Sequence, residues 1–219
     1  MPRRWNKGET LEQYKERMID SISESYCAAK WYNATIWLGH GQTASCHHPP
    51  GHWIPLEELK DNYTAIHNTK HKKLMRKYMQ EGKRPAECEY CWKVEDMGKN
   101  HVSDRTFKTE IFKDEDIHKS AEMPWDENVM LRTLEISFDR ACNFSCSYCN
   151  PAFSTAWVKD INTFGGYQNI QSDGRGHFVD TADWAKPAAK HEEDNPYIQA
   201  FHKWWENGLA DNLEEIRIT

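Results

Sequence analysis

Seven cysteines carry the chemistry that this sequence offers, and they fall into two groups. The chain has 219 residues, and the odd number of cysteines together with the lack of a secretory signal argues against a disulfide framework, because cytosolic thiols stay reduced. Clustered thiolates in a reducing compartment typically bind metal. The first group is Cys27, Cys46, Cys88 and Cys91, and the second is Cys142, Cys146 and Cys149.

The second group has the spacing C-x3-C-x2-C, which suits a reactive cluster. Soft thiolates so close in sequence can wrap one metal centre. A structural zinc ion normally takes four protein ligands, and so does a [4Fe–4S] cluster. Three thiolates would leave one iron of such a cluster open to another ligand. The alternative is a structural zinc site that adds a distant fourth ligand, such as His177 or another cysteine.

This triplet resembles the cluster motif of the radical-SAM superfamily. The aromatic Tyr148 stands directly before Cys149, and the alternating segment 131–138 predicts a strand where that family has its first barrel strand. The resemblance implies a [4Fe–4S] cluster with S-adenosylmethionine (SAM) on its open iron and Tyr148 packed near the adenine. It also implies reductive cleavage of SAM to a 5′-deoxyadenosyl radical, with an electron donor of the flavodoxin or ferredoxin type.

The first group of cysteines predicts a second metal site. Gly41 and Cys46 form a G-x4-C pattern, and Cys88 and Cys91 form a C-x2-C turn. With Cys27 they can converge on one tetrahedral centre, because the entropic cost of closing a loop grows only logarithmically with its length. This pattern resembles the auxiliary-cluster module called SPASM, or twitch in its shorter form, although that module usually follows the barrel.

The resemblance implies a second [4Fe–4S] cluster at these four cysteines, and structural zinc is the alternative, since four-cysteine zinc sites are common. Histidines at positions 40, 47, 48 and 52 surround Cys46 in the sequence. We interpret them as solvated loop residues rather than ligands.

The pattern of apolar residues predicts the elements that position these cysteines. Amphipathic spacing predicts helices over 9–30 and 56–81, and a further helix over 196–207 that ends at Gly208. Short strands are predicted within 31–54. Strands over 131–138 and 213–219, joined by a long crossover, predict a parallel βαβ unit. Residues 164–190 are expected to form an irregular insertion.

The fold class that follows is α/β, the start of a partial (β/α)6 radical-SAM barrel preceded by a small α+β cysteine-rich metal-binding domain. The expected division is a twitch-like domain over 1–100, a polar linker over 101–129, and the N-terminal part of the barrel over 130–219. Only about two barrel strands are identified, and the Gly-Gly-Glu segment that binds SAM in the family would lie further on. We therefore expect an N-terminal portion of a radical-SAM protein, with another chain as a candidate to complete the barrel.

Composition narrows the functions further. The net charge is −6, which gives no general attraction to nucleic acid or to acidic lipid. No apolar run reaches the ~18 residues that span a bilayer, so a cytoplasmic location is expected. The leading hypothesis is a radical-SAM enzyme acting on a peptide, a protein or a small molecule. The alternatives are a non-catalytic zinc- or iron–sulfur-binding scaffold, and a binding module with a tryptophan-rich surface.

Overall fold

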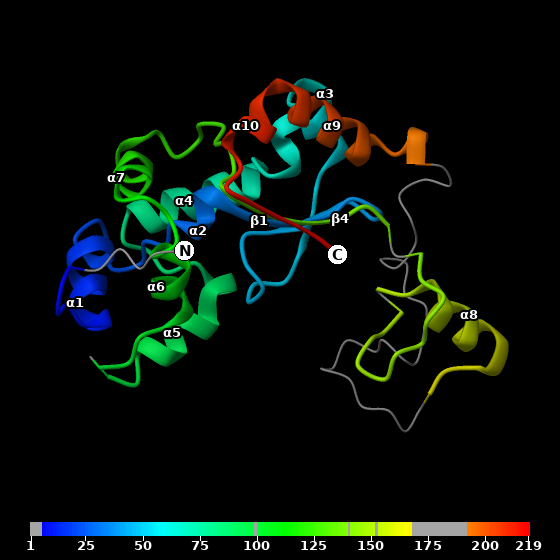
Figure 1. Cartoon of the computed structure of the whole chain (residues 1–219), viewed down its shortest axis with the longest axis horizontal. Helices are drawn as coiled ribbons and strands as arrows, with labels where there is room; N and C mark the ends of the chain where they lie inside the picture. The colour runs from blue at the N-terminus through cyan, green and yellow to red at the C-terminus, as the bar shows by residue number, and fades with distance from the viewer. Residues whose placement is uncertain (1–5, 99, 140, 152, 168–191) are drawn as a thin grey trace.

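A mixed five-stranded sheet connects the two cysteine-bearing parts of the chain (Figure 1). The computed structural model describes residues 6–98, 100–139, 141–151, 153–167 and 192–219. Within them the strand order is β3-β2-β1-β4-β5. The strands are β1 (Asn33–Trp37), β2 (Gln42–Ala44), β3 (His52–Trp53), β4 (Thr133–Ser137) and β5 (Glu215–Ile218). The fold is therefore mixed α/β.

The parallel part of the sheet combines early and late segments of the chain. β4 pairs in parallel with β5, as the predicted βαβ unit requires. β4 also pairs in parallel with β1, from Asn33 opposite Thr133 to Trp37 opposite Ser137. The described part of the chain contains one sheet, and β1, from the first hundred residues, lies at its centre. The expected linker at 101–129 therefore does not separate two independent sheets.

The two faces of this sheet differ in polarity. Apolar side chains such as Ile36, Leu134 and Ile136 point to one face, where Tyr197 and Phe201 cover them in a buried core. The helices there are α3 (Leu56–Asp61), the short η2 (Tyr63–Ile66), and α9 (Pro196–Trp204). The opposite face carries the alternate, polar side chains of the same strands, because successive residues of a strand point to opposite sides. These are Thr35, Thr133, Glu135, Ser137, Glu215 and Arg217.

A second core lies beside the amino ends of β1 and β4. It contains buried side chains of the first 129 residues, among them Trp31, Trp92 and Ile117. Figure 1 shows α1, α5, α6 and α7 gathered on this side. The helical elements here are α1 (Leu11–Lys15), η1 (Glu16–Asp20), α2 (Ala29–Tyr32), α4 (Lys70–Gln80), η3 (Ala86–Cys88), α5 (Glu89–Glu95), α6 (Asp104–Thr109) and α7 (Asp114–Glu122).

Three expectations about these helices need correction. The segment 9–30 is not one helix, because turns separate η1 from α2. The segment 56–81 is broken into α3, η2 and α4. The expected linker contains α6 and α7, whose side chains at Thr106, Thr109 and Ile117 are buried. The polar composition of this segment suggested a linker, but several of its polar side chains form hydrogen bonds inside the protein rather than with water.

The crossover between β4 and β5 contains α8 (Thr155–Phe164), η5 (Glu192–Asp194), α9, η6 (Trp205–Leu209) and α10 (Ala210–Asn212). Asn195 begins α9, since its side chain accepts hydrogen bonds from the backbone N–H groups of Tyr197 and Ile198. The backbone leaves the helical conformation at Asn207 and Gly208, where the glycine has φ = 101°. This agrees with the predicted helix end. Most of the expected insertion at 164–190, with His177, lies outside the described residues.

Candidate metal centres

The four early cysteines line one cavity. Cys27 precedes α2, Cys46 follows β2, Cys88 ends η3 and Cys91 lies in α5, yet all four side chains border the same space. The hairpin of β1 and β2 and the packing of α4 and α5 against the first core bring them together. The predicted grouping of these four residues is therefore seen in the arrangement of the side chains.

Burial raises the pKa of all four thiols. Burial raises the pKa of Cys27 to about 12, and the charges of the three other cysteines add to the shift. The pKa of Cys88 is raised to about 11, again first by burial. A metal that binds here must displace these protons, because only thiolates are ligands. The mutual influence of the four thiols also shows that they are close in space.

Cationic side chains surround the same cavity. Lys30 is 3% exposed, lines the cavity and forms an ion pair with Glu87. Although burial opposes the charge of Lys30, the nearby charges of Cys88 and Glu87 raise its pKa. Arg105 also lines the cavity, is 2% exposed, and forms ion pairs with Glu95 at 2.7 Å and Asp20 at 2.8 Å. Fixed positive charges of this kind stabilise a centre that carries net negative charge, as four thiolates do around a divalent ion or an iron–sulfur cluster.

One hydroxyl at this cavity lacks a partner. The side chain of Ser45, next to Cys46, is 3% exposed and lines the cavity. Its Oγ atom has no hydrogen-bond partner among the described residues. A buried polar group without a partner costs free energy, and each instance calls for an explanation such as a bound group. A sulfur of a bound metal centre would accept this hydrogen bond, so the residues present fit such a group.

The cysteine triplet lies in the loop that follows β4, at the carboxyl end of the parallel strands. The N–H of Cys142 donates to Oγ1 of Thr155 at 3.0 Å, and its carbonyl accepts from the N–H of Ala156 at 3.1 Å. The carbonyl of Cys146 accepts a hydrogen bond from the indole of Trp157 at 3.1 Å. The first turns of α8 therefore hold the backbone of the loop, while the three thiols remain partly exposed.

The side chain of Tyr148 lies beside Cys146. Its pKa is raised by a hydrogen bond to Cys146 and by the charges of Cys146, Cys149 and Cys142. The phenol thus contacts Cys146, and its environment includes the charges of the two other cysteines. The Tyr148 ring is 91% exposed and does not line the cavity next to this loop. The aromatic side chain that lines that neighbouring cavity from the loop is Phe153.

That neighbouring cavity lies at the carboxyl ends of the parallel strands and has a volume of about 550 Å³. Trp37, Ser137 and Thr219 border it where β1, β4 and β5 end, and Cys142 borders it from the loop. Glu135, on the polar face of β4, reaches the same space. Open parallel sheets bind ligands in this position, outside the carboxyl ends of their strands.

The two cysteine groups lie at opposite ends of β1. Cys46 follows β2, whose last residue Ala44 pairs with Thr35 in the middle of β1, and the side chain of Asn33, at the amino end of β1, donates to the carbonyl of Ser45. Cys142 follows β4, whose last residue Ser137 pairs with Trp37 at the carboxyl end. Five residues of strand extend roughly 15 Å. Two separate centres therefore have room to form, and neither group needs a ligand from the other.

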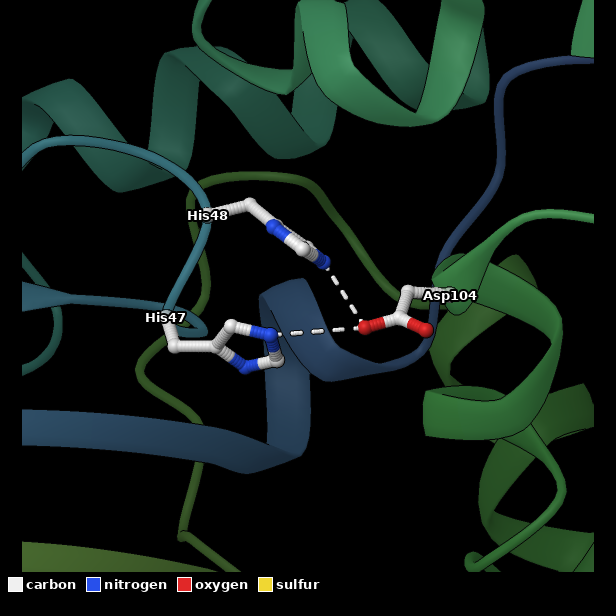
Figure 2. Close-up of side chains that lie close together, drawn as sticks. All are labelled: His47, His48 and Asp104. Carbon is white, nitrogen blue, oxygen red and sulfur yellow. Dashed lines mark hydrogen bonds and ion pairs between the residues drawn. The ribbon is translucent and has the colours of Figure 1, made fainter. Parts of the chain in front are cut away.

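Beside the four-cysteine cavity lies a group that sequence reasoning missed. Figure 2 shows His47 and His48 both facing the carboxylate of Asp104. The Nε2 atom of His48 is 2.7 Å from Oδ2 of Asp104, and that of His47 is 3.4 Å from the same oxygen. The His-His pair directly after Cys46 was the only feature of the sequence that could have indicated this group. No sequence pattern linked the pair to Asp104, which lies 56 residues beyond His48.

The interpretation of the four histidines as solvated is correct only for His47, whose side chain is 58% exposed. His40 is 7% exposed, and the side chain of His48 is 15% exposed. His52 is half-buried and hydrogen-bonded to Thr69. His40 packs in the β1–β2 turn against Trp37 and Trp53, while His48 and His52 contact residues at the starts of α6 and α4.

Comparisons with protein-family models, with curated proteins and with solved structures found no match for this chain. Within the described residues, no helix has both the length and the apolar character needed to cross a membrane. The geometry of the sites therefore carries the functional interpretation.

Proposed function

We propose that this chain is a radical-SAM enzyme, or the cluster-bearing part of one, with an auxiliary metal centre. The observation that carries the proposal is the position of the triplet loop. Its three partly exposed thiols follow a parallel strand and border, through Cys142, a cavity of about 550 Å³ at the carboxyl ends of β1, β4 and β5. A cluster with one open iron needs such a neighbouring space for its substrate.

The polarity of the sheet supports the same proposal. In a barrel of parallel strands and helices, the helices cover the outer face of the sheet, and the active site lies at the carboxyl ends of the strands. Here α9 covers the apolar face, while Glu135 and Ser137 on the other face line the cavity. This division is what the first strands of a partial barrel would present.

In this proposal Cys142, Cys146 and Cys149 hold a [4Fe–4S] cluster. When bound and reduced, that cluster supplies the electron that cleaves SAM and yields a 5′-deoxyadenosyl radical. The chain's own contributions are the positioning of the loop by α8, the polar wall at Glu135 and Ser137, and the aromatic walls at Trp37 and Phe153. A flavodoxin- or ferredoxin-type donor, a cytoplasmic location and a peptide or protein substrate belong to the same proposal.

The four-cysteine cavity would hold a second [4Fe–4S] cluster. Lys30 and Arg105, each paired with a carboxylate, place positive charge beside the four thiolates, and the unpartnered hydroxyl of Ser45 can donate to a sulfur of the cluster. A structural zinc ion would satisfy the charge argument equally well. A sulfide-bearing cluster offers more acceptor atoms for Ser45 than a zinc ion does.

Anaerobic reconstitution with iron and sulfide tests the proposal. The wild-type chain should bind about eight irons with matching labile sulfide, because each cube holds about four. Cys146→Ala should retain about four irons and lose the cleavage of SAM to 5′-deoxyadenosine. Cys88→Ala should lose the other four irons and keep the four that the triplet binds.

A chain that takes up zinc and no labile sulfide would contradict the proposal and favour a zinc-binding scaffold. Loss of both centres in Cys146→Ala, with a retained circular dichroism spectrum, would contradict the independence of the two sites. A His118→Ala variant, changed at an exposed position of α7, is the control for handling and folding.

A further inference from the structure

We propose that His47, His48 and Asp104 form a third metal site, which binds a divalent transition-metal cation of the zinc type through nitrogen and oxygen. The ligand atoms of the three residues all lie within 4.8 Å of one another. The site shares no ligand with the seven cysteines, so it does not depend on the function proposed above.

The arrangement of the three side chains suits such a cation. Two imidazoles from one loop face a single carboxylate oxygen from α6, at 2.7 Å and 3.4 Å (Figure 2). Zinc binds imidazole nitrogen and carboxylate oxygen at about 2.0–2.2 Å, so tetrahedral ligands are about 3.4 Å apart. Small movements of the two rings would place both nitrogens and the oxygen around one ion.

The surroundings hold the ligands in place. The ring of His48 stacks on Tyr90, with centroids 3.8 Å apart and an interplanar angle of 15°. The rings of His47 and His48 lie 4.0 Å apart, tilted by 46°. Fixing the orientation of a ligating imidazole through its neighbours is a common feature of metal sites.

Access and coordination number indicate the kind of site. The side chains of His47 and Asp104 are 58% and 34% exposed, so an ion can enter from solvent. Three protein ligands leave a fourth position for water or a small ligand, which is the arrangement of open rather than closed, structural zinc sites. His47 also borders a cavity of about 100 Å³ beside the polar side chains of Glu135 and Arg217. An incoming ligand would approach through this cavity.

The site borders the four-cysteine cavity, since His48 and Asp104 line both. A test must therefore separate nitrogen and oxygen ligands from sulfur ligands. Cobalt(II) does this, because thiolate ligation produces an intense sulfur-to-metal charge-transfer band and histidine–carboxylate ligation does not. We suggest adding Co²⁺ alone to the full chain after anaerobic reconstitution of the cysteine sites.

In the difference spectrum against the reconstituted protein, the wild type should bind one further Co²⁺ with weak d–d absorption and no new charge-transfer band, and Zn²⁺ should displace it. His47→Ala and Asp104→Asn should each lower the Co²⁺ affinity at least tenfold. Asp104→Asn keeps an acceptor for His48, which guards against misfolding. His118→Ala, on the exposed face of α7, should bind Co²⁺ like the wild type.

Unchanged Co²⁺ affinity in both His47→Ala and Asp104→Asn would overturn the proposal, as would a charge-transfer band as the only new signal. If the cysteines prove not to hold clusters, Co²⁺ will also occupy them and give that band. The weak absorption should then still be lost in Asp104→Asn while the band remains, which separates the failure of one proposal from the failure of the other.

Discussion

At the scale of single residues, burial changes the chemistry of side chains that look ordinary in the sequence. Lys30, Lys72 and Arg76 are each 3% exposed or less. Lys72 donates to Oγ1 of Thr43 at 2.8 Å and to the carbonyl of Ala44 at 3.0 Å. The hydrogen bonds of Lys72 hold β2 against α4, while Lys30, paired with Glu87, lies beside the four-cysteine cavity.

The half-buried His52 predicts an acid-sensitive fold. Burial, together with the positive charges of Lys72 and His71, lowers the pKa of His52 to about 3. In the unfolded chain its pKa is about 6.5, so the unfolded state binds a proton that the folded state excludes. The contribution of His52 is fully present above pH 6.5 and is lost as the pH falls toward 3.

From pH 7.5 to pH 5 this residue should therefore remove about 2 kcal/mol from the free energy of unfolding. Urea denaturation at the two pH values measures the loss. His52→Gln should show a loss smaller by that amount, whereas His118→Gln should follow the wild type. An equal loss in His52→Gln and the wild type would show that His52 is protonated in the folded state.

At the scale of elements, the β1–β2 hairpin depends on α9, far away in the sequence. Gly41 lies in the hairpin turn with φ = 73°. A Cβ atom there would meet the ring of Tyr197 at 2.2 Å. The hydroxyl of Tyr197 donates to the carbonyl of Ile54 at 3.1 Å, so this ring has little freedom to move away. The glycine of the G-x4-C pattern thus serves close packing in addition to the turn itself.

Gly41→Ala should destabilise the protein by about 3 kcal/mol, with about 1 kcal/mol from the positive φ and the rest from displacing the Tyr197 ring. Gly82→Ala is the matched control, because Gly82 has the same φ of 73° and a Cβ atom there would meet nothing within 4 Å. Its cost should be about 1 kcal/mol. Chemical denaturation of both variants gives the two values, and equal costs would show that the Tyr197 contact carries no energy.

At the scale of the whole molecule, the parallel pairing of β1 with β4 joins the two cysteine sites in one folding unit. The apolar face of β1, with Ala34 and Ile36, shares its core with Leu134, Ile136 and the side chains of α9. The four-cysteine cavity and the triplet loop lie at opposite ends of this shared strand pair. A division into an early and a late domain would cut through the sheet.

A fragment of residues 1–129 should therefore fail to fold cooperatively. It would expose the apolar face of β1 and leave its backbone N–H and C=O groups toward β4 unpaired. Circular dichroism with thermal unfolding would show a broad, non-cooperative loss of structure, and the full chain is the reference. A fragment with a sharp unfolding transition and a four-cysteine metal centre would contradict this and restore the two-domain division.

The sequence by itself determined the local features of this protein. The alternation at 131–138 and 213–219 specified β4 and β5, because a strand's two faces differ in polarity. Asn195, Pro196 and Gly208 specified the limits of the helical segment around α9, since caps and a positive φ act within a few residues. The spacing of Cys142, Cys146 and Cys149 placed three thiols in one loop without any long-range information.

Tertiary structure alone decided which distant residues meet. The position of β1 beside β4, the burial of α6 and α7, and the approach of Asp104 to His47 and His48 all join segments more than 50 residues apart in sequence. Local periodicity does not identify such partners, because the sequence does not show whether a polar side chain forms its hydrogen bonds with water or with a buried group. The convergence of Cys27, Cys46, Cys88 and Cys91 was foreseen only as a pattern, and the packing around α4 and α5 provides the cavity in which they meet.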